Sequence, residues 1–252
     1  MKITVITLTG DRPEAFALCQ RWMNSQTRKP DQWIVVDDGQ TPMVPVLDCG
    51  YIRREPRADD PKHTMIMNMK EAVKHIQGAY ILIMEDDEYY APGYIAALAD
   101  TLSRHEVAGI GRSKYYHLPT GGYLRHNNLG HASLAQMGFR ASFLPEFLSV
   151  LDGDQFLDIR LWKLLNGESA PVCDADDLTE MSRITKDKRG IIFDDGETNC
   201  LYVGMKGLPG RPGIGSGHGA HKFYNPDSET SMVLKKWIGD ETAFESYMRL
   251  TP

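Results

Sequence analysis

The segment from Tyr80 to Glu88 constrains the fold of this chain more than any other. Residues 80–84 are all apolar or aromatic, and such a run predicts a strand that is buried on both faces. The run ends directly in four consecutive carboxylates, Glu85, Asp86, Asp87 and Glu88. Adjacent negative charges repel one another and are costly to bury unpaired. Four carboxylates at a strand end are therefore typical of a site for a hard divalent cation, Mn²⁺ or Mg²⁺. A solvated acidic turn would give the same sequence pattern.

The chain before and after this segment alternates strand and helix patterns. Strands are predicted over residues 3–9, 33–36, 52–54 and 80–84, and helices over residues 14–24, 65–76 and 95–105. This alternation predicts an α/β fold, with a mixed, mostly parallel sheet and helices on both faces.

Polar side chains follow three of these strands at the point where each strand ends. They are Thr9 to Arg12, then Asp37 and Asp38, and then the four carboxylates. Ligands of open α/β sheets bind beyond the carboxyl ends of the strands. The three strand ends therefore predict one site for a nucleotide and its metal.

The second half of the chain is less regular. Residues 109–137 are rich in Gly, His, Tyr and Arg and show no clear hydrophobic period. Helices are predicted over residues 143–151, 156–165 and 231–247. Short strands are predicted over residues 191–193 and 201–203. Asp152 and Asp154 lie at a helix start, where capping is an alternative role.

Residues 204–222 are rich in glycine and are predicted to be irregular. Their cationic or metal-binding side chains would suit a diphosphate, although a flexible linker is the alternative. These side chains are Lys206, Arg211, His218, His221 and Lys222.

Composition excludes some classes of protein. The net charge of −6 provides no overall basic field for nucleic acid or anionic lipid. No stretch approaches the roughly 20 apolar residues that span a bilayer. The four cysteines are widely spaced, as in reduced intracellular proteins, so a cytoplasmic location is expected.

The order of these motifs resembles the family 2 glycosyltransferases of the GT-A fold. The resemblance rests on Arg12-Pro13 after the first strand, the run from Gln26 to Asp31, and Asp37-Asp38-Gly39 after the second strand. It rests also on Glu85-Asp86-Asp87 ahead of Pro92-Gly93, which is similar to the family's Asp-x-Asp metal motif. Glu85 departs from that motif, which has Asp at its first position.

The resemblance implies roles for individual residues. It implies Asp87 and His218 as metal ligands, with His221 as the second choice for the histidine, and Asp154 as the catalytic base, six positions before Arg160. Gly153 stands where the family usually has an acid, so Asp152 is the alternative base. The implied nucleotide-sugar-binding residues are Thr9, Arg12, Asp38, Glu85, Asp86 and Arg211.

One GT-A domain over residues 1–252 is expected. It would have a nucleotide-sugar half (1–108), an acceptor and catalytic half (109–222) and a helical tail (223–252). The resemblance implies an inverting, metal-dependent transfer, most simply from a UDP-sugar to an acceptor hydroxyl.

A saccharide acceptor is favoured. A hydroxymethylated base in DNA stays open and would need a basic face, formed from Arg112, Lys114, Arg125, Lys186, Lys188 and Arg189. A sugar-1-phosphate nucleotidyltransferase or a non-catalytic sugar-nucleotide-binding module are the alternatives. The segment from Thr9 to Pro13 is too short and too acidic for the loop that a nucleotidyltransferase needs.

Overall fold

The computed structural model describes residues 1–152, 156–167, 179–213 and 224–250. Its strands are β1 (Ile3–Thr9), β2 (Gln32–Asp37), β3 (Gly50–Arg53), β4 (Tyr80–Ile83), β5 (Tyr89–Tyr90), β6 (Val107–Ile110), β7 (Lys114–His117), β8 (Gly122–Arg125), β9 (Met137–Arg140), β10 (Ser182–Ile184), β11 (Gly190–Phe193), β12 (Tyr202–Lys206) and β13 (Asn225–Pro226). Its α-helices are α1 (Pro13–Ser25), α2 (Met65–Ala72), α3 (Tyr94–Leu102), α4 (Leu144–Val150), α5 (Leu157–Asn166), α6 (Met232–Ile238) and α7 (Glu241–Met248). Among these described helices, none combines the length and the apolar character needed to cross a membrane.

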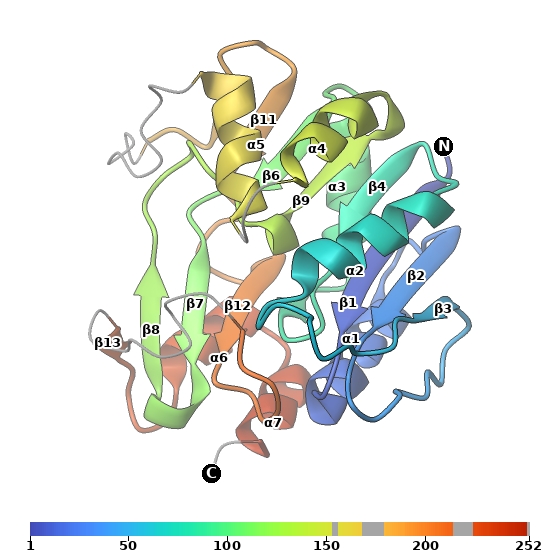
Figure 1. Ribbon diagram of the computed structural model, residues 1–252. Coiled ribbons are helices and arrows are strands. Elements are labelled where there is room, and N and C mark those ends of the chain that lie inside the picture. The colour runs from blue at the N-terminus through green and yellow to red at the C-terminus, as the bar shows by residue number, and fades with distance from the viewer. Residues whose placement is uncertain (153–155, 168–178, 214–223, 251–252) are drawn as a thin grey trace.

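The main sheet has the strand order β10-β11-β6-β9-β4-β1-β2-β3, which Figure 1 labels from β11 to β3. Strands β1 to β4 form a parallel block, because β1 pairs in parallel with β2 and β4, and β2 with β3. Strand β9 lies antiparallel between β4 and β6, and β11 is parallel to β6. The predicted α/β class and the mixed, mostly parallel sheet are therefore confirmed.

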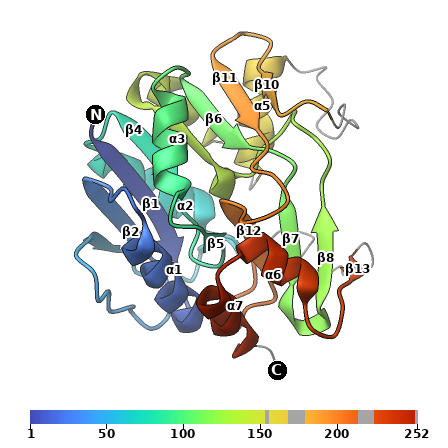
Figure 2. The same ribbon diagram turned by 180° about the vertical axis from the view of Figure 1, so that it is seen from behind.

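Helices cover both faces of this sheet, because successive side chains of a buried strand point to opposite sides. Ile3 and Val5 of β1 belong to one apolar core, with α1 and α3, while Ile6 and Leu8 belong to the other, with α2, α4 and α5. Helices α2, α4 and α5 lie on the face seen in Figure 1, and α1 and α3 on the face seen in Figure 2. A strand with both faces covered requires the near-continuous apolar sequence seen in β1, β2 and β4.

The other strands of the second half of the chain form, together with β5, a smaller sheet beside the first, with the order β13-β8-β7-β12-β5. Strand β12 pairs in parallel with β7 and antiparallel with β5, which directly follows the acidic turn of residues 85–88. Helices α6 and α7 pack near this sheet (Figure 2), and Trp22 of α1 donates a 2.9 Å hydrogen bond to the Tyr247 hydroxyl of α7. The C-terminal helices are thus joined to the main core.

Two sequence predictions were wrong in detail. The helix predicted over residues 231–247 is two helices, because Gly239 adopts the left-handed conformation (φ +67°) and Asp240 then caps α7 through the Ala243 amide. The segment predicted to be irregular from residue 204 begins inside β12, whose last residues are Gly204, Met205 and Lys206. Gly204 is required there, because a Cβ at this position would collide with the ring of Tyr115.

Candidate active site

Three neighbouring parallel strands end at one edge of the main sheet and bring the predicted polar residues together. Thr9 ends β1 and pairs in register with Asp37 of β2, while the acidic turn follows β4. The Thr9 hydroxyl donates a 2.6 Å hydrogen bond to Asp86. The predicted convergence of the strand ends is therefore confirmed.

The acidic turn holds four carboxylates against two cations. Arg12 lies 2.7 Å from Asp86 and 2.6 Å from Asp87, and Lys206 lies 2.5 Å from Glu88. The side chains of Asp86, Asp87 and Glu88 are almost fully buried. With every group ionised, this turn and its two partners carry a surplus of two negative charges.

Burial in this turn makes the charge surplus costly. It raises the pKa of Glu85 to about 7, with Asp87 adding to the effect, and the pKa of Asp86 to about 7, against the opposing pull of Arg12. It raises the pKa of Glu88 to about 8 despite Lys206. A cation close to these buried carboxyl groups would stabilise their ionised form and so lower their pKa values.

A divalent cation fits the donor atoms of this turn. Carboxylate oxygens of Glu85, Asp87 and Glu88 all lie within 4.8 Å of one another. Such a set, made only of oxygen, suits Mg²⁺ or Mn²⁺. The described residues that could hold the ion therefore include Asp87, the ligand that the family resemblance implies.

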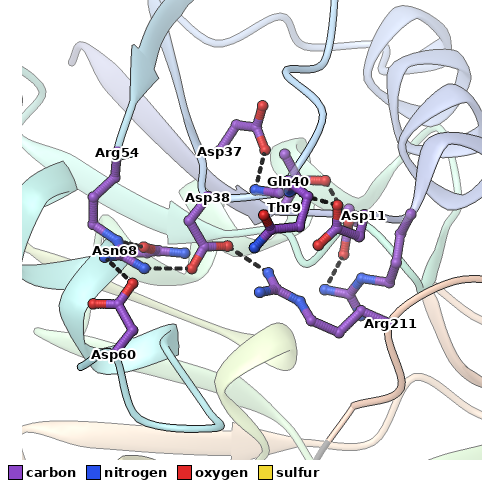
Figure 3. A network of polar contacts seen from close by, with 12 residues as sticks. Thr9, Asp11, Asp37, Asp38, Gln40, Arg54, Asp60, Asn68 and Arg211 are labelled. Carbon is purple, nitrogen blue, oxygen red and sulfur yellow. Dashed lines mark hydrogen bonds and ion pairs between the residues drawn. The ribbon is translucent and has the colours of Figure 1, made fainter. Parts of the chain in front are cut away.

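Asp38 forms the second part of the site, beyond β2 (Figure 3). Its buried carboxylate accepts a 2.6 Å hydrogen bond from Arg54 through Oδ2 and one from Arg211 through Oδ1. Burial alone would raise the pKa of Asp38, but the hydrogen bonds from Arg211, Thr64 and Arg54 outweigh it and lower the pKa. Asp38 is therefore an anion at neutral pH.

Arg54 is held rigidly, and sequence analysis did not identify it. It also donates to Asp60 at 2.8 Å and to Asn68 at 2.6 Å (Figure 3). Its position directly after β3, the next parallel strand, was the signal that could have identified it. Lys206 was identified, but as part of an exposed loop, whereas it is buried and paired with Glu88.

Arg211 comes from the last quarter of the chain, far in sequence from Asp38, and reaches the same site. Its backbone amide donates a 3.1 Å hydrogen bond to the Asp11 carbonyl, and a Cβ on Gly10 would collide with the Arg211 guanidinium. The side chain, about one-third exposed, lies against Asp38. The structure thus brings Arg211 next to Asp38 and to the turn after β1.

Some predicted residues do not have a described place. Asp154, His218, His221 and Lys222 lie outside the described residues. Asp152, the alternative base, is exposed and lies 2.6 Å from Lys70 of α2.

Two of the six cations that a basic face for a DNA acceptor would need do not lie at the surface. Arg112 and Lys114 are buried, with 1% exposure each, and lie 2.9 Å from Asp194 and 2.5 Å from Asp195, respectively. Arg125 lies 2.5 Å from Glu197. Arg112 and Lys114 therefore pair inside the protein, because burial of a charge requires an opposite partner. Arg125 is one-third exposed, and Lys186 and Lys188 are exposed.

Comparison with known families agrees with this geometry. The sequence profile described as "Glycosyl transferase family 2" matches residues 4–148, which is more than half of the chain. The chain belongs to glycosyl transferase family 2. The matched residues include all three strand ends of the site. Family membership favours a glycosyltransferase that uses a nucleotide-sugar donor over both alternatives, the nucleotidyltransferase and the non-catalytic binding module.

Solved structures support the GT-A fold of this family 2 chain. It is similar to TarS residues 1–349 of S. aureus, with a TM-score of 0.53 and 12% identity over 81% of this chain and 60% of that chain. The same TarS fragment in complex with UDP matches with a TM-score of 0.52. The TarS matches carry this support; a mannosyltransferase, PcManGT from Pyrobaculum calidifontis in complex with GDP-Man and Mn²⁺, also matches, with a TM-score of 0.48 at 13% identity, over 78% of this chain and 57% of that chain. The chain spans about 60% of the length of the TarS fragment, and no curated protein sequence matches it.

Proposed function

We propose that this family 2 enzyme transfers a sugar from a UDP-sugar to an acceptor hydroxyl, with inversion at the anomeric carbon and with a divalent cation at the acidic turn. The observation that carries the choice of nucleotide is the state of Asp38. Arg54 occupies one carboxylate oxygen and is itself fixed by Asp60 and Asn68. The other oxygen, Oδ1, accepts from Arg211, whose side chain is more exposed than that of Arg54.

A carboxylate with one available oxygen matches uracil. Uracil presents a single N–H donor, at N3, between two carbonyl acceptors. Guanine presents two adjacent N–H donors, which pair best with both oxygens of a carboxylate. Binding of uracil thus requires Arg211 to leave Oδ1 while Arg54 stays, and the freed guanidinium then lies near the diphosphate.

The other residues of the site have complementary roles in the proposal. Thr9 and Arg12 border the nucleoside, and Thr9 and Arg12 both fix Asp86. Glu85 binds the ribose or a water on the metal, and Asp87 binds the cation, with His218 as the proposed further ligand. When bound, the cation offsets the negative charge that develops on the leaving UDP.

The proposed transfer is a single displacement. The acceptor oxygen attacks the anomeric carbon from the face opposite UDP, forming the glycosidic bond as the bond to the diphosphate oxygen breaks. Asp154 takes the proton of the acceptor hydroxyl, an assistance worth about 10²–10⁴-fold in rate. UDP leaves with the electron pair of the broken bond.

Thermal unfolding with a panel of nucleotides tests the donor site. A ligand at 100 times its dissociation constant stabilises by about 2.7 kcal/mol. We expect UDP with Mn²⁺ to raise the Tm of the wild type more than GDP, CDP or UDP without metal. The variant Asp87→Ala should lose the metal-dependent part, whereas the control Asp100→Ala, on the exposed face of α3, should keep it. Equal stabilisation of wild type by GDP and UDP would refute the reading of Asp38.

A further inference from the structure

A second polar cluster, which the proposed donor site does not use, lies beside the acidic turn. Tyr115 of β7 begins it, because Lys206, the partner of Glu88, lies 5.4 Å above the Tyr115 ring. His126 packs edge-on against the same ring, with 5.6 Å between ring centroids. A chain of contacts thus leads from the acidic turn to the loop that follows β8.

That loop ends in a histidine–carboxylate pair. His131 Nε2 lies 2.9 Å from Oδ2 of Asp158, in the first turn of α5, and both side chains are partly exposed. His131 is also near enough to His126 to lower its pKa, after the larger effect of desolvation. Burial raises the pKa of the Tyr115 hydroxyl, Lys206 opposes this, and the charges of Glu88 and Asp158 both add to it. Tyr115 therefore contacts Lys206 next to the acidic turn and His126 at the start of the loop that leads to the His131–Asp158 pair.

The pair fixes which ring nitrogen of His131 can receive a hydrogen bond. A neutral histidine that donates from Nε2 to a carboxylate has an unprotonated Nδ1, which accepts. No described residue hydrogen-bonds to this Nδ1. A ligand hydroxyl can therefore donate to it.

The same loop contains further unsatisfied acceptors. The Oδ1 atoms of Asn127 and Asn128 are buried and have no hydrogen-bond partner among the described residues. Buried polar atoms of native proteins are rarely left in this state without a functional reason. The loop from His126 to His131 thus offers acceptors for a ligand rich in hydroxyl groups.

The structure assigns Tyr115, His126 and the His131–Asp158 pair to an acceptor subsite for a neutral saccharide. The inference rests on the proposed glycosyl transfer and extends it to the acceptor. The apolar C–H face of a sugar ring packs against the half-buried Tyr115 ring, and an acceptor hydroxyl donates to His131 Nδ1. A neutral acceptor is favoured over DNA because the neighbouring cations Arg112, Lys114 and Arg125 are already paired with carboxylates.

Release of UDP from UDP-glucose and UDP-N-acetylglucosamine tests this subsite. It is measured with Mn²⁺, alone and with a panel of methyl glycosides, and in a third arm with an oligonucleotide that contains 5-hydroxymethylcytosine. The variants are His131→Ala, Asp158→Ala, Asp158→Asn and Tyr115→Ala. The matched controls are His75→Ala, on the exposed turn after α2, and Asp100→Asn on α3.

We expect a methyl glycoside to raise UDP release by the wild type above the rate of donor hydrolysis. The three alanine variants should raise the KM for that glycoside about tenfold, as expected for loss of a hydrogen bond or a stacking contact. Asp158→Asn should recover part of this loss, because its amide oxygen still accepts from His131. In the His131 and Asp158 variants, donor hydrolysis and the Tm shift with UDP and Mn²⁺ should stay within twofold of wild type.

The possible failures are distinguishable. A wild type that UDP and Mn²⁺ do not stabilise refutes the donor site and the subsite with it. Normal donor binding with an unchanged KM in the alanine variants refutes the subsite alone. Stimulation by the oligonucleotide and by none of the methyl glycosides overturns the assignment to a neutral saccharide.

Discussion

Replacing Lys206 by methionine tests how much of the stability depends on compensating the buried acidic turn. Lys206 Nζ lies 2.5 Å from Glu88 Oε1, and the two side chains are 10% and 2% exposed. Methionine keeps most of the apolar length of the side chain and removes only the charge and its hydrogen bond. The change therefore removes the ion pair with Glu88 together with the weaker cation–π contact to Tyr115.

The size of the effect follows from burial and from the pKa of Glu88. A hydrogen bond to a charged group contributes about 1.5–3 kcal/mol, so Lys206→Met should lower the free energy of unfolding by about 2 kcal/mol at pH 7. The pKa of Glu88 is about 8 with Lys206 present and rises further without it. Above pH 8 each pH unit adds up to about 1.4 kcal/mol to the loss, which gives about 3 kcal/mol at pH 9.

Thermal unfolding in a metal chelator, followed by circular dichroism, measures this loss. For a domain of this size it corresponds to a fall in Tm of about 4–8 °C at pH 7 and about 6–12 °C at pH 9. The control Lys235→Met removes an exposed partner of Glu241 and should cost less than about 0.5 kcal/mol. The double variant Lys206→Met with Glu88→Gln should recover at least half of the loss at pH 9. A Lys206→Met variant no less stable than the control, or equally destabilised at pH 7 and pH 9, would refute the reasoning.

Three further predictions concern the same edge of the sheet. The metal-free protein should lose stability as the pH rises from 5 to 8, because carboxyl groups whose pKa is raised in the folded state keep protons that the unfolded chain releases. A urea midpoint that stays constant over this pH range would contradict this prediction. These carboxyl groups are Glu85, Asp86 and Glu88. Gly10→Ala should lower the free energy of unfolding, measured by urea titration, by about 1–3 kcal/mol, because the added Cβ collides with Arg211 and Asp38. The control is Gly93→Ala, where the added Cβ meets a leucine side chain at 3.5 Å. Arg211→Ala should weaken binding of UDP but not of uridine, because the base gains free access to Asp38 while the diphosphate loses a cation. Isothermal titration calorimetry compares the affinities for the two ligands. An equal loss of affinity for both would count against the proposed movement of Arg211.

Much of the donor side of the site could be predicted from the order of residues along the chain. A buried strand must be apolar on both faces, so β1, β2 and β4 are visible as apolar runs. Parallel neighbours place their carboxyl ends at one edge, so Thr9, Asp38 and the acidic turn had to meet once the sheet was recognised. The family resemblance depends on the same three strand ends, and the sequence profile of the family confirms it.

Tertiary structure decided what each of these side chains contacts. Arg211 meets Asp38 across 173 positions of sequence, and Lys206 meets Glu88 across 118. The His131–Asp158 pair joins a loop to a helix, and Tyr115 contacts the donor side only because β12 pairs with both β7 and β5. The pattern of apolar and polar residues along a segment shows which face of a helix or strand is buried, and this pattern depends only on residues that are close in sequence. Contacts between distant segments depend on strand register and loop path, and these are fixed only when the whole core packs.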